Sequence, residues 1–154
     1  MNEFSLSRNP LDASAISALS AALASSHAGA LVTFEGRVRD TNAGLTVLEL
    51  EYEAYPALSL KEGQAVMDEA TAQAGVLGAR CVHRVGLLSV GDVAVWIGVL
   101  GGHREEAFHA CRYIIDEVKR RVPIWKKERY ADGSSGWIGA EGAAASLPSS
   151  TPDR

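Results

Sequence analysis

Hydrophobic and polar residues alternate along two stretches in the first part of the chain, and this alternation predicts strands. Residues 29–40 read GALVTFEGRVRD, and residues 46–55 read TVLELEYEAY. Between them, Asn42 to Gly44 is typical of a turn. We therefore expect the two strands to pair as a hairpin.

Three other stretches repeat their apolar residues every three or four positions, which is typical of helices. They cover Leu11 to Ser26, Ala57 to Ala74, and His103 to about Arg121. The third has the strongest pattern, because its apolar residues recur at i, i+3, i+4 and i+7. We expect these residues to form its buried stripe: Ala107, Phe108, Cys111, Ile114, Ile115 and Val118.

Two apolar runs rich in β-branched residues lie between the second and third helices. They cover residues 79–88 and 93–100, with a turn signal at Gly91-Asp92. The second run reads VAVWIGVL and is apolar nearly throughout. It predicts a central strand that is covered on both faces.

After the third helix, Pro123 begins an extended segment that reaches Tyr130, and residues 136–140 return as a short strand. Helices that alternate with pairs of strands predict an α+β fold, with the helices packed on a mostly antiparallel sheet. We expect residues 1–141 to form one domain. Residues 142–154 are rich in Ala, Ser and Pro, so we expect a disordered tail there.

The composition is that of a globular protein with a slightly acidic balance. The chain has 154 residues and a net charge of −4, which disfavours a general nucleic-acid binder. Two cysteines, Cys81 and Cys111, are too few for a disulfide framework. The N-terminus does not resemble a signal peptide, and no apolar stretch approaches the ~20 residues that span a bilayer. We therefore expect a cytoplasmic protein with reduced thiols and no membrane contact.

Positive charge is concentrated around the end of the third helix. Eight of the fifteen Lys and Arg residues lie between His103 and Arg129, together with five acids, so this stretch has a local charge of +3. Such a patch on an acidic protein indicates a small anionic ligand or an acidic partner.

The most informative residues in this patch are Lys119 and Lys126, in the segment VKRRVPIWKKE. A helix that ends in cations and turns at proline into a strand can point both amines into one pocket, which suits anion binding and acyl chemistry. Because Lys119 adjoins Val118 of the buried stripe, we expect it to be partly buried and able to act as a nucleophile or proton donor. We treat Arg120 and Arg121 as surface residues. The alternative for all these cations is that they only complement the helix dipole.

Two other cationic pairs are candidates for anion binding. His103 and Arg104 lie at a helix start, where free backbone N–H groups and the positive end of the dipole favour a phosphate. The alternative is a tight turn with a solvated pair. Arg37 and Arg39 can clamp an anion, but ion pairs with acids of the hairpin are the favoured interpretation.

The sequence does not predict a metal site. Cys81 and His83 can share a strand face, but His109 and Cys111 are two positions apart on a helix and point in different directions. Burial in the core is the favoured interpretation for these residues. The chain also lacks a phosphate loop, a dinucleotide fingerprint and a Ser-His-Asp signature.

Several motifs occur in a fixed order: GALVTFEGRVRD, LELEYEAYP, VHRVGLLSVGD, GGHREEAF and VKRRVPIWKKE. With them, the chain from about Gly29 to Trp137 resembles the large, catalytic subunit of molybdopterin synthase. The resemblance implies an α/β hammerhead-type fold and a homodimer. It also implies a small ubiquitin-like partner, whose Gly-Gly end carries a thiocarboxylate, in a heterotetramer. The enzymes of this family, which act in molybdenum cofactor biosynthesis, move sulfur from two such partners onto cyclic pyranopterin monophosphate, with no metal or organic cofactor.

The resemblance also implies roles for six residues. Lys119 and Lys126 match the essential lysines. Lys126 attracts the thiocarboxylate, and Lys119 either assists proton transfer and stabilises charge or captures the acyl group. The family's pocket for the pterin and its phosphate matches Arg39, His103 and Arg104. An aromatic residue near the partner's tail matches Phe34.

One departure from the family pattern lies near the end of the resemblance. The family often has a basic residue shortly after the tryptophan that matches Trp137, and residues 138–141 supply none. Either Arg129 or Lys127 substitutes, or this end of the pocket is weaker. Two rival interpretations remain: a non-catalytic module that binds an anionic metabolite or a ubiquitin-like tail, and a degenerate homologue.

Overall fold

The computed structural model describes residues 1–139, so the predicted tail at 142–154 and the last residue of the predicted strand at 136–140 lie outside the described residues. Helices and strands alternate along this range. In chain order they are β1 (Asn2–Ser7), α1 (Ala13–Ala22), β2 (Ala30–Arg37), β3 (Thr41–Asn42), β4 (Leu45–Ala54), α2 (Pro56–Thr71), β5 (Val76–Arg84), β6 (Gly86–Ser89), β7 (Val93–Gly101), α3 (Arg104–Arg121), β8 (Ile124–Tyr130) and β9 (Ser135–Ile138).

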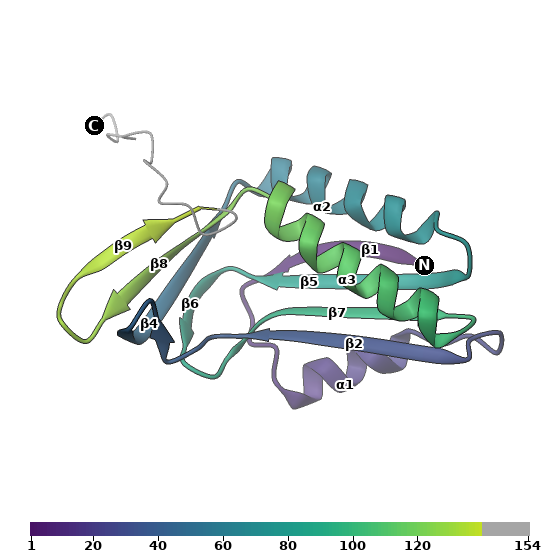
Figure 1. Ribbon diagram of the computed structural model, residues 1–154, viewed down its shortest axis with the longest axis horizontal. Coiled ribbons are helices and arrows are strands. Elements are labelled where there is room, and N and C mark those ends of the chain that lie inside the picture. The colour runs from purple at the N-terminus through teal and green to yellow at the C-terminus, as the bar shows by residue number, and fades with distance from the viewer. Residues whose placement is uncertain (140–154) are drawn as a thin grey trace.

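A four-stranded sheet in the order β1-β5-β7-β2 forms the main body of the molecule (Figure 1). β7 pairs antiparallel with both β5 and β2, whereas β1 pairs parallel with β5. α2 and α3 cover one face of this sheet, and α1 packs against the other. Every residue of β7 is therefore buried, which confirms the prediction of a central strand covered on both faces.

α3 buries the predicted apolar stripe with one exception. Ala107, Cys111, Ile114, Ile115 and Val118 are buried. Phe108 is 62% exposed, so its assignment to the stripe is wrong. The physical reason is geometric, because consecutive residues are separated by about 100° around a helix and Phe108 lies beyond the stripe's edge.

A second sheet, in the order β3-β4-β8-β9, lies at the left of Figure 1, and β6 also pairs with β4. The predicted hairpin between residues 29–40 and 46–55 is wrong, because β2 belongs to the main sheet and β4 pairs with β8 and β6. The turn itself exists, since Ala43 and Gly44 have positive φ, but it joins β4 to the short β3. The inner face of β2, with Val32 and Phe34, packs on the main core instead.

The predicted strand at 79–88 is two strands. β5 ends at Arg84, and β6 begins at Gly86, whose φ of 94° redirects the chain from the first sheet to the second. All strand pairs in the described part of the chain except β1 with β5 are antiparallel. The predicted α+β class with mostly antiparallel pairing is therefore confirmed, although its strands form two sheets.

β1 is an element that the sequence pattern did not predict. Its Phe4 side chain is buried against α2 at Gly63, where an added Cβ would overlap the Phe4 ring. A glycine inside a helix costs about 1 kcal/mol relative to alanine. The close packing of Phe4 explains why glycine occupies this position.

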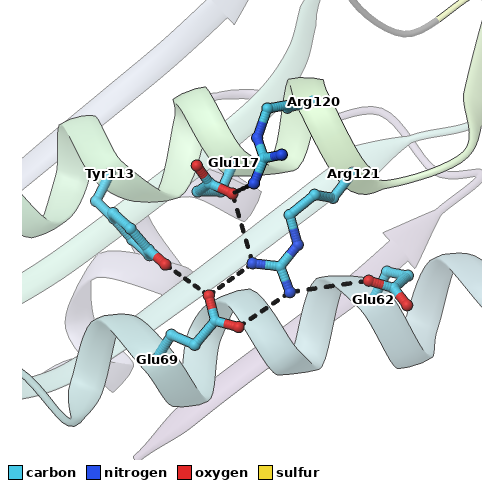
Figure 2. A network of polar contacts seen from close by, with 6 residues as sticks. All are labelled: Glu62, Glu69, Tyr113, Glu117, Arg120 and Arg121. Carbon is cyan, nitrogen blue, oxygen red and sulfur yellow. Dashed lines mark hydrogen bonds and ion pairs between the residues drawn. The ribbon is translucent and has the colours of Figure 1, made fainter.

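A network of polar contacts ties the end of α3 to α2 (Figure 2). The guanidinium of Arg121 lies 2.6 Å from a carboxylate oxygen of Glu69 and 3.4 Å from one of Glu117. Tyr113 donates a further hydrogen bond to Glu69. The Arg121 side chain is only 21% exposed, so its interpretation as a surface residue is wrong. These contacts hold the helix end from which Lys119 projects.

Candidate active site

The end of α3 and the start of β8 bring two lysines to one side of the molecule. α3 ends at Arg121, because Pro123 has no N–H group to continue the helix. In β8, Ile124 and Glu128 are buried, and Lys126 lies between them on the same face of the strand. The chain thus passes from a helix end to a strand within the six residues that lie between the lysines.

A cavity of about 440 Å³ lies where the end of α3, β8 and the connection after β2 meet. Four of the six predicted site residues line it: Phe34, Arg39, Lys119 and Lys126. Lys119 is exposed in the single chain, so the expected partial burial of this side chain is not found. Both amines nevertheless belong to one cavity, as the pattern of helix, proline and strand predicts.

The other two predicted residues, His103 and Arg104, do not line this cavity. They are exposed at the first turn of α3, whereas Lys119 lies in its last turn. The 18 residues of α3 span about 27 Å. One copy of the chain therefore does not bring the start of α3 and the two lysines together.

Lys126 is held by a buried carboxylate. Its Nζ lies 3.3 Å from Oε1 of Glu128, whose other oxygen accepts hydrogen bonds from Asn42 and Tyr130. Burial acts to raise the pKa of Glu128, but these two hydrogen bonds and the charge of Lys126 outweigh it and hold the pKa below its ordinary value. Glu128 therefore stays ionised. The sequence reasoning missed Glu128, although its spacing of two from Lys126 in a strand was an available signal.

Arg37 and Arg39 differ in what holds them. Arg37 forms an ion pair at 2.6 Å with Glu35 of its own strand, so the favoured interpretation, an ion pair across the hairpin, is wrong for Arg37. Arg39 lies beyond the end of β2, is exposed and lines the cavity. Of the two, Arg39 is thus the better placed to meet an anion in the cavity.

Neither candidate substitute for the missing base after Trp137 reaches the cavity. Nζ of Lys127 lies 5.6 Å from the centre of the Trp137 ring, and Arg129 forms an ion pair with Glu49 at 2.8 Å. Both side chains leave β8 on the face opposite to Lys126. Ile138 and Gly139 line this end of the cavity instead.

Of the residues considered for metal binding, the two cysteines lie in the core, whereas His83 lines the cavity and His109 is exposed, so the expected burial is wrong for His109. Cys81 and Cys111 are buried free thiols, and burial raises the pKa of both, that of Cys111 to about 11. Within residues 1–139, no group of three His, Cys, Asp or Glu side chains is arranged to hold a metal ion. None of the three helices in this range is both long and apolar enough to cross a membrane.

The model of the family described as MoaE protein matches residues 6–121, which is most of the chain. The chain belongs to the MoaE family. A relative from Thermoplasma volcanium, named molybdopterin synthase catalytic subunit, is 44% identical over 110 residues, which cover 71% of this chain and 80% of the relative.

Solved structures support the same family and fold. Molybdopterin synthase from Staphylococcus aureus has a TM-score of 0.78 and 35% identity, and the match covers 90% of this chain and 98% of that one. A complex of subunits 1 and 2 of molybdopterin-converting factor from Helicobacter pylori has a TM-score of 0.68 at 22% identity, covering 96% and 97% of the two chains. This second match supports the fold alone. The resemblance to molybdopterin synthase catalytic subunits is thus confirmed for this MoaE chain.

Proposed function

We propose that this chain is the catalytic subunit of a molybdopterin synthase. In the proposed reaction, sulfur moves from the C-terminal thiocarboxylate of a small ubiquitin-like carrier to cyclic pyranopterin monophosphate, and two transfers form the dithiolene of molybdopterin. The observation that carries the proposal is that Lys119 and Lys126 of a MoaE-family chain line one cavity.

The charges around the cavity fit its two proposed ligands, which are both anions. Four cationic side chains line it against a single carboxylate, that of Glu128. They are Arg37, Arg39, Lys119 and Lys126. Glu35 pairs with Arg37 and Glu128 with Lys126, so part of the charge of these two cations is compensated, whereas no described acid forms an ion pair with Arg39 or Lys119. An excess of positive charge in a partly enclosed site attracts anionic substrates and stabilises negative charge as it develops.

The two lysines take different parts in the proposed chemistry. Lys126 attracts the carrier's thiocarboxylate, and Phe34 lies beside the carrier's tail. Lys119 either stabilises charge and supplies a proton as sulfur leaves, or its Nζ attacks the thiocarboxylate carbon. The second route leaves the carrier's last glycine joined to Lys119 by an amide bond. Mass spectrometry of the denatured reaction mixture distinguishes the two routes, because only the second gives a covalent carrier adduct.

Within one chain, we assign binding of the pterin's phosphate to Arg39. His103 and Arg104 are about a helix length away from the same chain's lysines. If they bind the phosphate, as the resemblance implies, they must do so in the cavity of a second copy. We therefore propose that the chain acts as a homodimer.

The test is a defined reaction with the protein, a thiocarboxylated carrier and the cyclic pterin, followed by detection of the dithiolene product. We expect Lys119→Ala to reduce the rate at least about 100-fold, with the fold and carrier binding unchanged. Lys61→Ala, in an exposed position on α2, is the matched control and should keep the rate.

Two results would contradict the proposal. Near-normal product formation by the Lys119→Ala protein would refute the role of Lys119. Carrier binding by the unaltered protein without any product would favour the non-catalytic module or the degenerate homologue.

A further inference from the structure

His83 in β5 lines the same cavity as the two lysines, and the proposed reaction gives it no part. Its Nδ1 atom lies 2.7 Å from the backbone carbonyl oxygen of Arg84. Because a carbonyl oxygen can only accept, Nδ1 carries the proton and donates it. In the neutral ring, Nε2 therefore has a free lone pair and can only accept a hydrogen bond.

The orientation of the His83 ring is fixed from two sides. The backbone bond holds its Nδ1 edge, and Tyr52 of β4 packs against it edge to face, with ring centres 4.9 Å apart and planes at 83°. Nε2 lies on the ring edge away from this backbone bond, and His83 as a residue lines the cavity. No side chain in the described part of the chain donates a hydrogen bond to it.

Three of the segments that line the cavity contribute charged groups. α3 contributes Lys119, β8 contributes Lys126 and Glu128, and the segment from β2 contributes Arg37 and Arg39. Glu128 is already engaged by Lys126, and Arg37 by its own strand. Lys119 has no ion pair with any described acid, which leaves its ammonium free to meet a neutral acceptor.

The neutral state of the His83 ring is consistent with its being such an acceptor. Burial lowers the pKa of His83 to about 4, and the nearby charge of Lys119 adds to the decrease, although the hydrogen bond to the Arg84 carbonyl opposes it. His83 and Lys119 line the same cavity, where such a charge can act on the ring. At neutral pH the ring is therefore uncharged.

We propose that His83 is a positioning residue for Lys119, whose ammonium donates a hydrogen bond to Nε2 and is thereby held against the carrier's thiocarboxylate. This inference deepens the proposed function and rests on it. An exposed lysine has four rotatable bonds, and a single acceptor restricts their freedom. A neutral imidazole does so without cancelling the positive charge, whereas a carboxylate would compete with the anionic ligand.

Two substitutions separate positioning from simple packing. His83→Asn keeps an N–H donor close to the place of Nδ1 and removes the acceptor at Nε2. His83→Gln puts an amide oxygen near the place of Nε2. We expect His83→Asn to reduce the single-turnover rate of sulfur transfer about 10–100-fold, with unchanged carrier affinity, and His83→Gln to retain a rate within a few-fold of the unaltered protein. His27→Gln, in an exposed loop, is the control and should keep the rate.

A purely structural role predicts the reverse order, with His83→Asn more active than His83→Gln. That order, or full activity in both variants, would overturn the proposal.

A second measurement does not depend on turnover. The ring nitrogens of His83 are followed by NMR as the pH is lowered, in the unaltered protein and in the Lys119→Ala variant. Removal of the nearby cation should raise the midpoint of the His83 titration, and an unchanged midpoint would overturn the pairing. A protein that forms no dithiolene but shows the shift would refute the proposed function while leaving the His83–Lys119 contact intact.

Discussion

The ammonium nitrogen of Lys126 lies 3.3 Å from Oε1 of Glu128, two residues further along the same face of β8. Glu128 is only 4% exposed, so its charge depends on the groups that bind it. This ion pair holds the Lys126 side chain at the cavity, and the carboxylate neutralises much of its positive charge. Lys119, which faces the same cavity, has no such carboxylate, and the two lysines therefore meet a ligand in different electrostatic states.

Glu128→Gln should slow sulfur transfer because it removes the ion pair that orients Lys126. The amide is nearly the same size and still accepts hydrogen bonds, so we expect a rate loss of about 10-fold and a stability loss of only about 1–2 kcal/mol. Single-turnover dithiolene formation and thermal unfolding measure the two effects. Glu53→Gln, exposed on the other face of β4, is the control. An unchanged rate in Glu128→Gln would show that the ion pair does not orient Lys126.

Arg121→Ala should destabilise the fold by about 1–3 kcal/mol, because it leaves Glu69 and Glu117 without their shared partner in a half-buried position (Figure 2). The matched control is Arg112→Ala. The Arg112 side chain, which pairs with Asp116, is 80% exposed, so loss of this ion pair should cost at most about 0.5 kcal/mol. Urea denaturation of the two variants compares these costs directly, and equal losses would contradict the structural role of Arg121.

The stability of the protein should decrease as the pH falls from about 6.5 to about 4, in part because of His83. Its pKa in the folded protein is about 4, below that of the same group in an unfolded chain, because burial disfavours the charged ring. In this window the unfolded chain binds a proton that the folded protein does not, so acid favours unfolding. The contribution of His83 to the decrease is at most about 3.4 kcal/mol. Chemical denaturation at several pH values measures it, and His83→Gln should show a smaller decrease. Identical pH profiles would contradict this assignment.

Mixed dimers test whether the start of α3 serves the cavity of a second copy. We expect Lys119→Ala and Arg104→Ala to be impaired each on its own, since each removes one part of every site. When the two variants are dissociated and mixed, half of the dimers are hybrids, and each hybrid has one intact site. Product formation should therefore return to about a quarter of the unaltered level. Mixing that restores nothing, although hybrids form, would show that Arg104 does not complete the cavity of a second copy.

Local sequence patterns were sufficient to predict those elements of the fold that depend on a short stretch of sequence. The repeat at three and four residues determined α3, and the continuous apolar run of residues 93–100 determined β7 as the covered central strand. The meeting of Lys119 and Lys126 was also predictable. Only six residues, Pro123 among them, lie between the two lysines, so the change from helix to strand sets their arrangement.

The sequence by itself thus determined the class of fold, its main elements and a basic cavity at the end of α3. Only the tertiary structure decided that β2 pairs with β7, that His83 and Glu128 join the lysines, and that the start of α3 lies about 22 Å along the helix from Lys119. The physical reason is that periodicity records which face of an element is apolar. Which distant segment covers that face depends on packing the whole chain at once.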